Sequence, residues 1–72
     1  MTKTSQKEIG MRIRYLRKSN RLSIEKLSLV SGVNKNYLGD LERGTRNPTL
    51  LVLEKIARGL NITLEELFKG IM

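Results

Sequence analysis

Two short stretches of helical periodicity lie on either side of Gly32, and the few residues between them restrict how the chain can fold. Each stretch follows a residue that caps helix N-termini, Ser23 before the first and Asn34 before the second. Gly32 ends the first, because glycine tolerates the left-handed conformation of a sharp exit, and Gly44 follows the second. So short a connection predicts two helices that cross steeply. Their apolar positions are Ile24, Leu27, Val30, Leu38 and Leu41.

Two further helices are predicted next to this pair. A capping box of Ser5 and Glu8 opens a helix over about residues 5–19. After the pair, Asn47 is expected to cap a helix with Pro48 in its first position, where a missing N–H costs nothing. The apolar residues of these two helices are Ile9, Ile13, Leu16, Leu50, Leu53, Ile56, Ala57 and Leu60.

A fifth helix completes the expected fold. Asn61 ends the fourth helix in the role often given to glycine. A second capping box, formed by Thr63 and Glu66, then opens a terminal helix over residues 63–71. No segment alternates with period two for long enough to predict a strand. The sequence therefore predicts one all-α domain over residues 1–72.

Charge and composition narrow the range of partners. The chain has a formal net charge of +7, which favours a polyanion such as nucleic acid or an acidic membrane surface. Half of its 14 basic residues lie within residues 1–22, where Glu8 is the only acid. Cysteine and histidine are absent, which removes thiol nucleophiles and the usual imidazole ligands and bases. We therefore expect no enzyme, no metal and no cofactor.

The sequence also predicts where the protein works. No apolar run approaches the roughly 20 residues of a membrane span, and residues 1–10 lack the apolar block of a signal peptide. Residues 1–4 are expected to form a loose tail. A cytoplasmic protein that does not bind a membrane is the expectation.

The two helices around Gly32 have the helix-turn-helix arrangement, and the surrounding sequence resembles the Cro and lambda-repressor class of regulators, the XRE family. The resemblance runs from Ile9 to Phe68 and is carried by IRYLRKSNRLSIEKLSLVSGVNKNYLGDLERGTRNPTLLVLEKIARGLNITLEELF. Within it, YLGDLERGTRNPTL is most similar to the controller proteins of restriction-modification systems. It implies a compact five-helix lambda-repressor-like domain that binds double-stranded DNA and regulates transcription. A dimer would read an inverted-repeat operator through the third helix in the major groove.

The resemblance also implies which side chains read bases. Lys35, Asn36 and Asp40 fall on positions that usually meet base edges in this family. Their chemistry fits, because lysine donates to guanine, asparagine pairs with adenine and aspartate accepts from cytosine N4. The alternative is a solvated helix face on which Asp40 pairs with Arg43, three residues later.

Contacts with the DNA backbone are implied as well, and they would position the protein without reading sequence. Gly39 lies mid-helix, where glycine is unfavourable, and so indicates a close approach by DNA backbone or by the second helix. Simple capping is the alternative for Ser23, Asn34 and Asn47, and a place in the core is the alternative for Tyr37. The implied backbone-contacting residues are Ser23, Asn34, Tyr37, Arg43, Thr45, Arg46 and Asn47.

Other positions concern the scaffold. Arg17 and Glu42 stand where the family tends to form a partly buried ion pair between the first and third helices. Ile24 departs from the family pattern, which usually has a glutamine there that contacts a phosphate, so this contact is missing or replaced. Ser28 stands where alanine is common, and we interpret it as tolerated packing.

The terminal helix has an apolar stripe that either completes the core or pairs with a second copy. Related controller proteins pair through this region, so the resemblance favours a homodimer. RNA polymerase is a further partner of such regulators, although no residue of the sequence marks a surface for it. The residues of the stripe are Leu64, Leu67, Phe68 and Ile71.

Two other classes of function remain open. An antitoxin-like module would sequester another protein, but such proteins usually add a disordered tail, whereas this sequence ends within a few residues of its last helix. A peripheral membrane binder needs basic residues around a large exposed apolar face. The basic residues of the first helix instead surround a stripe that the core requires.

Overall fold

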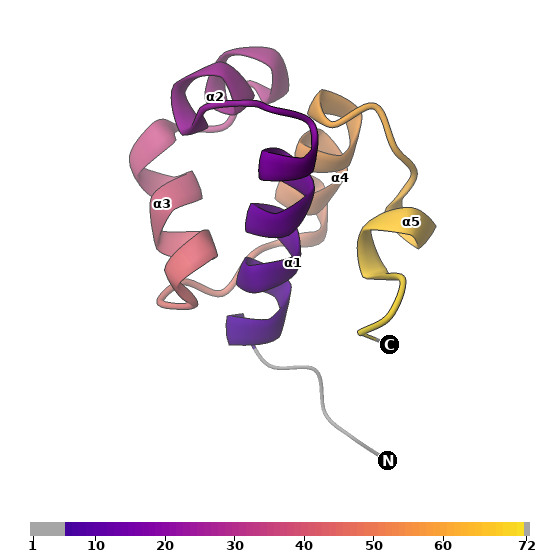
Figure 1. Cartoon of the computed structure of the whole chain (residues 1–72). Helices are drawn as coiled ribbons and strands as arrows, with labels where there is room; N and C mark the ends of the chain where they lie inside the picture. Colours follow the sequence, from indigo (N-terminus) through magenta and orange to yellow (C-terminus); the bar gives the residue numbers. More distant parts are fainter. Residues whose placement is uncertain (1–5, 72) are drawn as a thin grey trace.

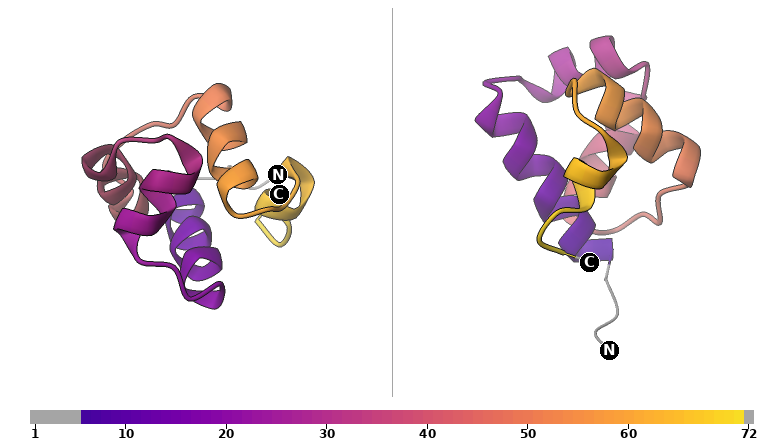
Figure 2. Two further views of the ribbon diagram at one scale, coloured as in Figure 1. Left: turned by 90° about the horizontal axis from the view of Figure 1, so that it is seen from above. Right: turned by 90° about the vertical axis from the view of Figure 1, so that its right-hand side faces the viewer.

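The computed structural model describes residues 6–71, which form five helices and no strand (Figure 1). The all-α prediction is confirmed, while the capping box expected at Ser5 and the tail expected at residues 1–4 lie outside the described residues. Helix α1 packs against α3 and α5, and α2 packs against α3 and α4 (Figure 2). The helices are α1 (Gln6–Ser19), α2 (Ile24–Ser31), α3 (Lys35–Arg43), α4 (Leu50–Gly59) and α5 (Leu64–Phe68).

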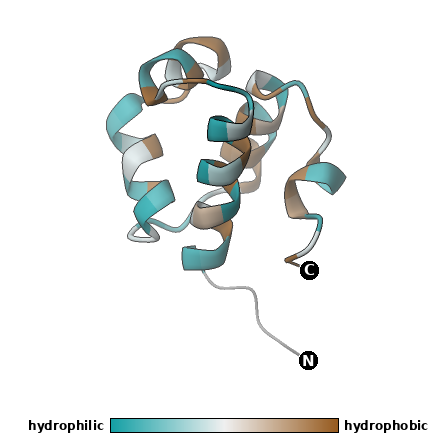
Figure 3. Ribbon diagram, viewed as in Figure 1, coloured by the Kyte–Doolittle hydropathy of each residue, from teal (hydrophilic) through white to brown (hydrophobic). Residues whose placement is uncertain are grey.

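An aliphatic core holds the five helices together, and every helix contributes to it. Figure 3 shows hydrophilic and hydrophobic segments alternating along α1 and α3, as expected of helices with one buried face. Two of the predicted apolar positions do not belong to the core, because Val30 is 46% and Leu50 is 63% exposed, whereas Val33 in the turn after α2 is buried. The core residues are Ile13, Leu27, Val33, Leu38, Leu41, Leu53, Ile56, Ala57, Leu60 and Leu67.

Two glycines allow helices to touch through their backbones. A Cβ at Gly10 would overlap the carbonyl oxygen of Leu41, which places α1 directly against the end of α3. A Cβ at Gly59 would lie 2.8 Å from the Cβ of Ser31, so α4 meets α2 as closely. Larger residues at these positions would force the helices apart, and α3 would lose its fixed orientation.

The predicted N-caps of the second, third and fifth helices are confirmed. The Ser23 hydroxyl accepts a hydrogen bond from the Lys26 amide at 3.0 Å. The Asn34 side chain accepts from the amides of Asn36 and Tyr37 at 2.8 and 3.2 Å. Thr63 and Glu66 form the expected capping box. These local signals therefore start each helix at the expected residue.

The predicted start of the fourth helix was wrong. Thr49 is the N-cap of α4, and its hydroxyl accepts from the Val52 amide at 3.1 Å. Asn47 and Pro48 precede the helix in a connection without regular secondary structure. Both Asn47 and Thr49 have side chains suited to capping, and a proline tends to keep the residue before it in extended backbone. Asn47 is thereby left exposed in the loop.

Each of the last two helices is followed by a residue with left-handed backbone conformation. Asn61 ends α4 in the left-handed conformation, with φ 62, as predicted for a residue in the place of glycine. Helix α5 is shorter than the predicted segment and ends at Phe68, followed by Gly70 at φ 89. Ile71 therefore lies in the turn after the helix.

Arg12 connects α1 to α5, which the sequence analysis did not anticipate. Its Nε donates to the carbonyl of Leu67 at 3.1 Å, and its Nη2 donates to the carbonyl of Glu66 at 2.8 Å. A guanidinium is favourable there because the last carbonyls of a helix lack partners within the helix. This contact helps to hold the short α5 beside α1 (Figure 1).

Candidate nucleic-acid interface

A buried ion pair holds α3 against α1. Arg17 donates from Nε to Oε2 of Glu42 at 2.7 Å and from Nη2 to Oε1 at 3.0 Å. Its Nη1 also donates to the carbonyl of Leu22 at 2.9 Å, which ties in the segment before α2. Glu42 is 7% exposed, and the hydrogen bonds that Arg17 donates to this carboxylate raise the pKa of Arg17 above its usual value. The ion pair predicted between the first and third helices is therefore formed.

The first residues of α3 face solvent. Lys35 and Asn36 are both exposed, and the side-chain amide of Asn36 makes no hydrogen bond to any part of residues 6–71. The Lys35 Nζ lies 3.8 Å from Oε2 of Glu25 on α2, and both side chains are more than half exposed. Such a pair in water is weak. The ammonium group and the amide are thus accessible to a ligand.

A shallow hollow lies between α2 and α3, and most of the residues that line it are polar or charged. Ile24 stands at its edge in place of the family's glutamine, and it packs against the core instead of offering a polar group. Ser28, expected as simple packing, donates from its hydroxyl to the carbonyl of Val33 at 2.6 Å across the turn between these helices. The hollow is lined by Ile24, Glu25, Lys35, Asn36, Gly39, Asp40 and Arg43.

Gly39 accommodates a side chain of its own helix. An ideal Cβ at Gly39 would lie 3.2 Å from Nη1 of Arg43, and no atom of α2 is among its nearest neighbours. Of the two neighbours considered for this glycine, the second helix is not among the nearest, and an approach of DNA stays a prediction. The guanidinium of Arg43 lies over the position that a larger residue would fill.

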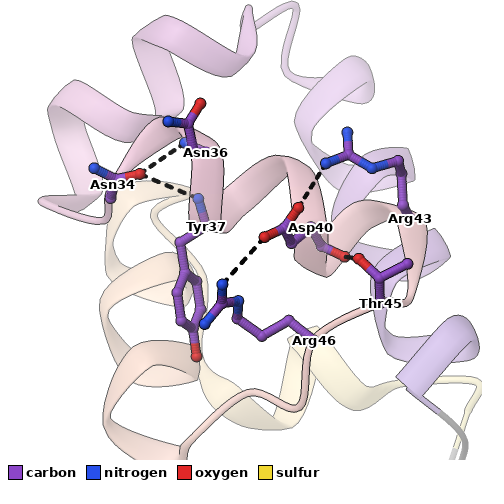
Figure 4. A network of polar contacts seen from close by, with 7 residues as sticks. All are labelled: Asn34, Asn36, Tyr37, Asp40, Arg43, Thr45 and Arg46. Atoms are coloured by element: carbon purple, nitrogen blue, oxygen red, sulfur yellow. Dashed lines mark hydrogen bonds and ion pairs between the residues drawn. The ribbon is translucent and has the colours of Figure 1, made fainter.

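Asp40 is the centre of an exposed network (Figure 4). Its Oδ1 accepts from Nη2 of Arg43 at 2.6 Å, and its Oδ2 accepts from Nη2 of Arg46 at 3.2 Å. The pairing with Arg43 was one of the two expectations for this residue, whereas the second partner was not anticipated. Hydrogen bonds from Arg43 and then Arg46 hold the pKa of Asp40 below its ordinary value of 3.8.

Tyr37 and Thr45 border the same network. The guanidinium of Arg46 lies 4.7 Å from the centre of the Tyr37 ring, which is a cation–π distance, and the ring packs partly against the core. The hydroxyl of Thr45 donates to the backbone carbonyl of Asp40 at 3.1 Å, next to the left-handed Gly44 that ends α3. The end of α3 and the following loop therefore present two arginines side by side.

The predicted backbone-contacting residues do not all belong to this network. Ser23 caps α2 and Asn34 caps α3, so their side-chain oxygens accept from backbone amides. Asn47 is exposed in the loop before α4 and caps no helix. The structure brings together Tyr37, Asp40, Arg43, Thr45 and Arg46.

Of the four residues predicted to form the dimer contact, one lies in the core and three lie partly at the surface. Leu67 is 1% exposed and belongs to the core of the single chain, so its assignment to a dimer interface was wrong. Leu64, Phe68 and Ile71 are half-buried. Met11 and Tyr15 on α1, which the sequence analysis left out, are 59% and 62% exposed and line a shallow hollow with Ile71. They share one side of α1, four residues apart and outside its buried stripe.

The helices described here include none that is both long enough and apolar enough to cross a membrane.

Comparisons with known proteins agree with this geometry. Residues 13–67 match the family model described as Helix-turn-helix. Control protein C.MunI of a Mycoplasma species is 41% identical over 63 residues, which cover 86% of this chain and 85% of that protein. SlrR, a helix-turn-helix transcriptional regulator of Bacillus subtilis, is 44% identical over 61 residues, but the chain spans only 40% of its length.

Solved structures with the same fold include two controller proteins. The restriction-modification controller protein C.AhdI from Aeromonas hydrophila is 41% identical, with a TM-score of 0.85 over 88% of this chain and 96% of that one. The controller protein C.Esp1396I, solved as a tetramer in complex with its natural 35 base-pair operator, is 26% identical, with a TM-score of 0.86 over 92% of this chain and 87% of that one.

Proposed function

The chain belongs to the helix-turn-helix family, and on this basis we propose that it is a sequence-specific regulator of transcription that binds double-stranded DNA and has no catalytic role. The observation that carries the proposal is the exposure of Lys35 and Asn36 at the start of a helix that a buried ion pair fixes in place. In helix-turn-helix proteins the first residues of the second helix meet base edges in the major groove. The proposal places the chain in the cytoplasm with the DNA that it binds.

Two of the three predicted base-reading residues remain assigned to bases. Lys35 donates to guanine, and Asn36 has an unoccupied amide that matches the two-point pairing with adenine. Asp40 is engaged on both oxygens by arginines, so we do not retain it as a base reader.

The remaining contacts go to the sugar-phosphate backbone. Arg43 and Arg46 supply positive charge beside the recognition residues, and Tyr37 and Thr45 border them with polar groups (Figure 4), while Asn47 is the exposed residue that follows Arg46 in the loop. Ser23 and Asn34 mark the starts of α2 and α3, where free backbone amides suit a phosphate. Phosphate contacts of this kind fix orientation and release counterions.

A homodimer would present two copies of α3 to successive major grooves, about 34 Å apart, and so read an inverted repeat. We assign the dimer contact to Leu64, Phe68 and Ile71 together with Met11 and Tyr15. Apolar side chains exposed beside a short terminal helix support this assignment. Similarity to C.MunI and C.AhdI supports the further proposal of a restriction-modification controller.

A fluorescence titration tests the DNA-binding proposal. The probes are the DNA immediately upstream of this chain's own coding sequence and a scrambled duplex of the same composition, each measured at two salt concentrations. We expect Lys35→Ala and Asn36→Ala to reduce the preference for the upstream DNA by roughly 1–3 kcal/mol per lost bidentate contact. Arg46→Ala should weaken binding to both duplexes alike, and Arg58→Ala, an exposed arginine on α4, is the charge-matched control. Equal affinity of the unaltered protein for both duplexes would reject sequence-specific binding.

Sedimentation tests the dimer separately. We expect a species of twice 8.2 kDa at micromolar concentration, and Tyr15→Glu should shift it toward the single chain without unfolding it, because Tyr15 is 62% exposed. A single 8.2 kDa species in the unaltered protein would reject the assignment.

A further inference from the structure

We propose that Asp40 is a positioning residue for DNA binding, which holds Arg43 and Arg46 in the orientation that receives the phosphates of one DNA strand. The inference rests on the proposed function, since it names the residue that prepares the phosphate contacts of that same surface. It replaces the role of cytosine reader that the sequence alone suggested for Asp40.

The two carboxylate oxygens of Asp40 bind two different arginines. One oxygen of Asp40 accepts from Arg43 and the other from Arg46, so a single side chain holds both guanidinium groups. Each arginine uses only one of its N–H groups in this contact, and a guanidinium has five. Both arginines therefore keep donors for a phosphate while they remain bound to Asp40.

The guanidinium of Arg46 has a second restraint, because it lies over the ring of Tyr37 at 4.7 Å. That of Arg43 lies beside Gly39, 3.2 Å from where a Cβ would stand, so the glycine leaves room for it. The two arginine side chains are 49% and 64% exposed, and exposed arginines lose considerable rotamer freedom when a ligand fixes them. Restraining them beforehand removes part of this loss from the binding step.

The charge of the cluster bears on phosphate binding as well. Asp40 is ionised at neutral pH, where any carboxyl group with a pKa of 3.8 or lower is, so its contacts with the two arginines persist there. Two guanidinium groups and one carboxylate leave the cluster with one net positive charge. The cluster therefore attracts a phosphate even though one of its members is an anion.

Glu25→Gln is the matched control for Asp40→Asn. Both residues line the hollow between α2 and α3, and each substitution removes one negative charge from it. Glu25, however, forms an exposed ion pair with Lys35 at 3.8 Å and acts on Arg17 through its charge, without a hydrogen bond to any arginine of residues 6–71. A general effect of charge on DNA affinity appears in both variants, whereas loss of positioning appears only in Asp40→Asn.

The experiment is a titration of both variants and the unaltered protein against the upstream duplex and the scrambled duplex over a series of salt concentrations. For Asp40→Asn we expect binding about ten-fold weaker on both duplexes. The slope of its plot of log affinity against log salt should be shallower, by the amount that corresponds to the loss of about one to two phosphate contacts. Glu25→Gln should bind as tightly as the unaltered protein or more tightly, with an unchanged slope. Asp40→Glu, which keeps the charge, should recover part of the affinity.

Three results would overturn the inference. A loss confined to the upstream duplex, at unchanged slope, would make Asp40 a base reader. Tighter binding than that of Glu25→Gln would make it an anion that competes with phosphate. Unchanged NMR signals of the Arg43 and Arg46 Nε–Hε groups in free Asp40→Asn would mean that the carboxylate does not hold them. Failure of the proposed function shows itself differently, as equal affinity of the unaltered protein for the two duplexes.

Discussion

Two arginine–carboxylate contacts within residues 6–71 can be compared, one buried and one exposed. Arg17 and Glu42 meet between α1 and α3, where their side chains are 11% and 3% exposed. Asp40 meets Arg43 and Arg46 on the outer side of α3, where all three side chains are at least 31% exposed. Both contacts join guanidinium to carboxylate, but one arginine binds both oxygens of Glu42, whereas two arginines share those of Asp40.

The difference shows what burial does to an ion pair. A buried carboxylate cannot exchange its partner for water, so loss of Arg17 would leave an uncompensated charge inside the domain. An exposed carboxylate can exchange its partners for water, and such a pair contributes little to stability. We infer that the buried pair orients α3 and that the exposed network prepares the arginines that bind DNA beside α3.

The largest expected effect is that of Arg17→Met. It should lower the free energy of unfolding by about 3–5 kcal/mol, because Glu42 is left buried without a partner. Urea denaturation followed by circular dichroism measures this, with Arg14→Met on the exposed side of α1 as the control. The double variant Arg17→Met with Glu42→Leu should recover much of the loss. Equal effects of Arg17→Met and Arg14→Met would remove the distinction between the buried and exposed pairs.

A smaller effect, of opposite sign, is expected from Gly39→Ala. Alanine is favoured over glycine within a helix by up to about 1 kcal/mol, and the new Cβ would meet only the movable guanidinium of Arg43. The variant should be slightly more stable and yet bind both DNA duplexes more weakly. Gly10→Ala provides the contrast, because there the Cβ would overlap backbone and the domain should be destabilised. If Gly39→Ala is more stable but binds DNA with unchanged affinity, Arg43 does not contribute to phosphate binding.

The smallest effect concerns the titration of Asp40. Since its folded-state pKa lies below 3.8, its contacts with the arginines are present at neutral pH and are lost only as the pH falls through that lower value. Carbon-13 NMR of the carboxyl group should give a midpoint below 3.8, which Arg43→Ala should move upward more than Arg46→Ala. A midpoint at or above 3.8 would indicate that the network is absent in solution.

Much of the fold could be predicted because its signals are local. The caps Ser23, Asn34 and Thr63 lie within three residues of the amides that they bind, so the sequence places them reliably. The same reasoning failed at Asn47, because Thr49 offers a second capping side chain across Pro48 and a local pattern does not choose between them. Exposure of the first residues of α3 follows from the positions of its two buried leucines.

The partners of Arg12 and Arg46 could not be predicted from spacing. Arg12 reaches a carbonyl 55 residues away, and Arg46 reaches Asp40 across the loop that follows the left-handed Gly44. Both contacts depend on the path of the chain between helices. The sequence similarly marked an apolar stripe on the last helix without showing that Leu67 faces inward.

The sequence by itself determined five amphipathic helices, their order, the basic character of the chain and the polar residues at the start of α3. Capping and periodicity act over a few residues and survive in any arrangement of the helices. Only the tertiary structure decided how far each carboxylate is removed from water, nearly completely for Glu42 beside Arg17 and much less for Asp40 on the outer side of α3. Removal from water is a property of the packed helices, which no local pattern contains.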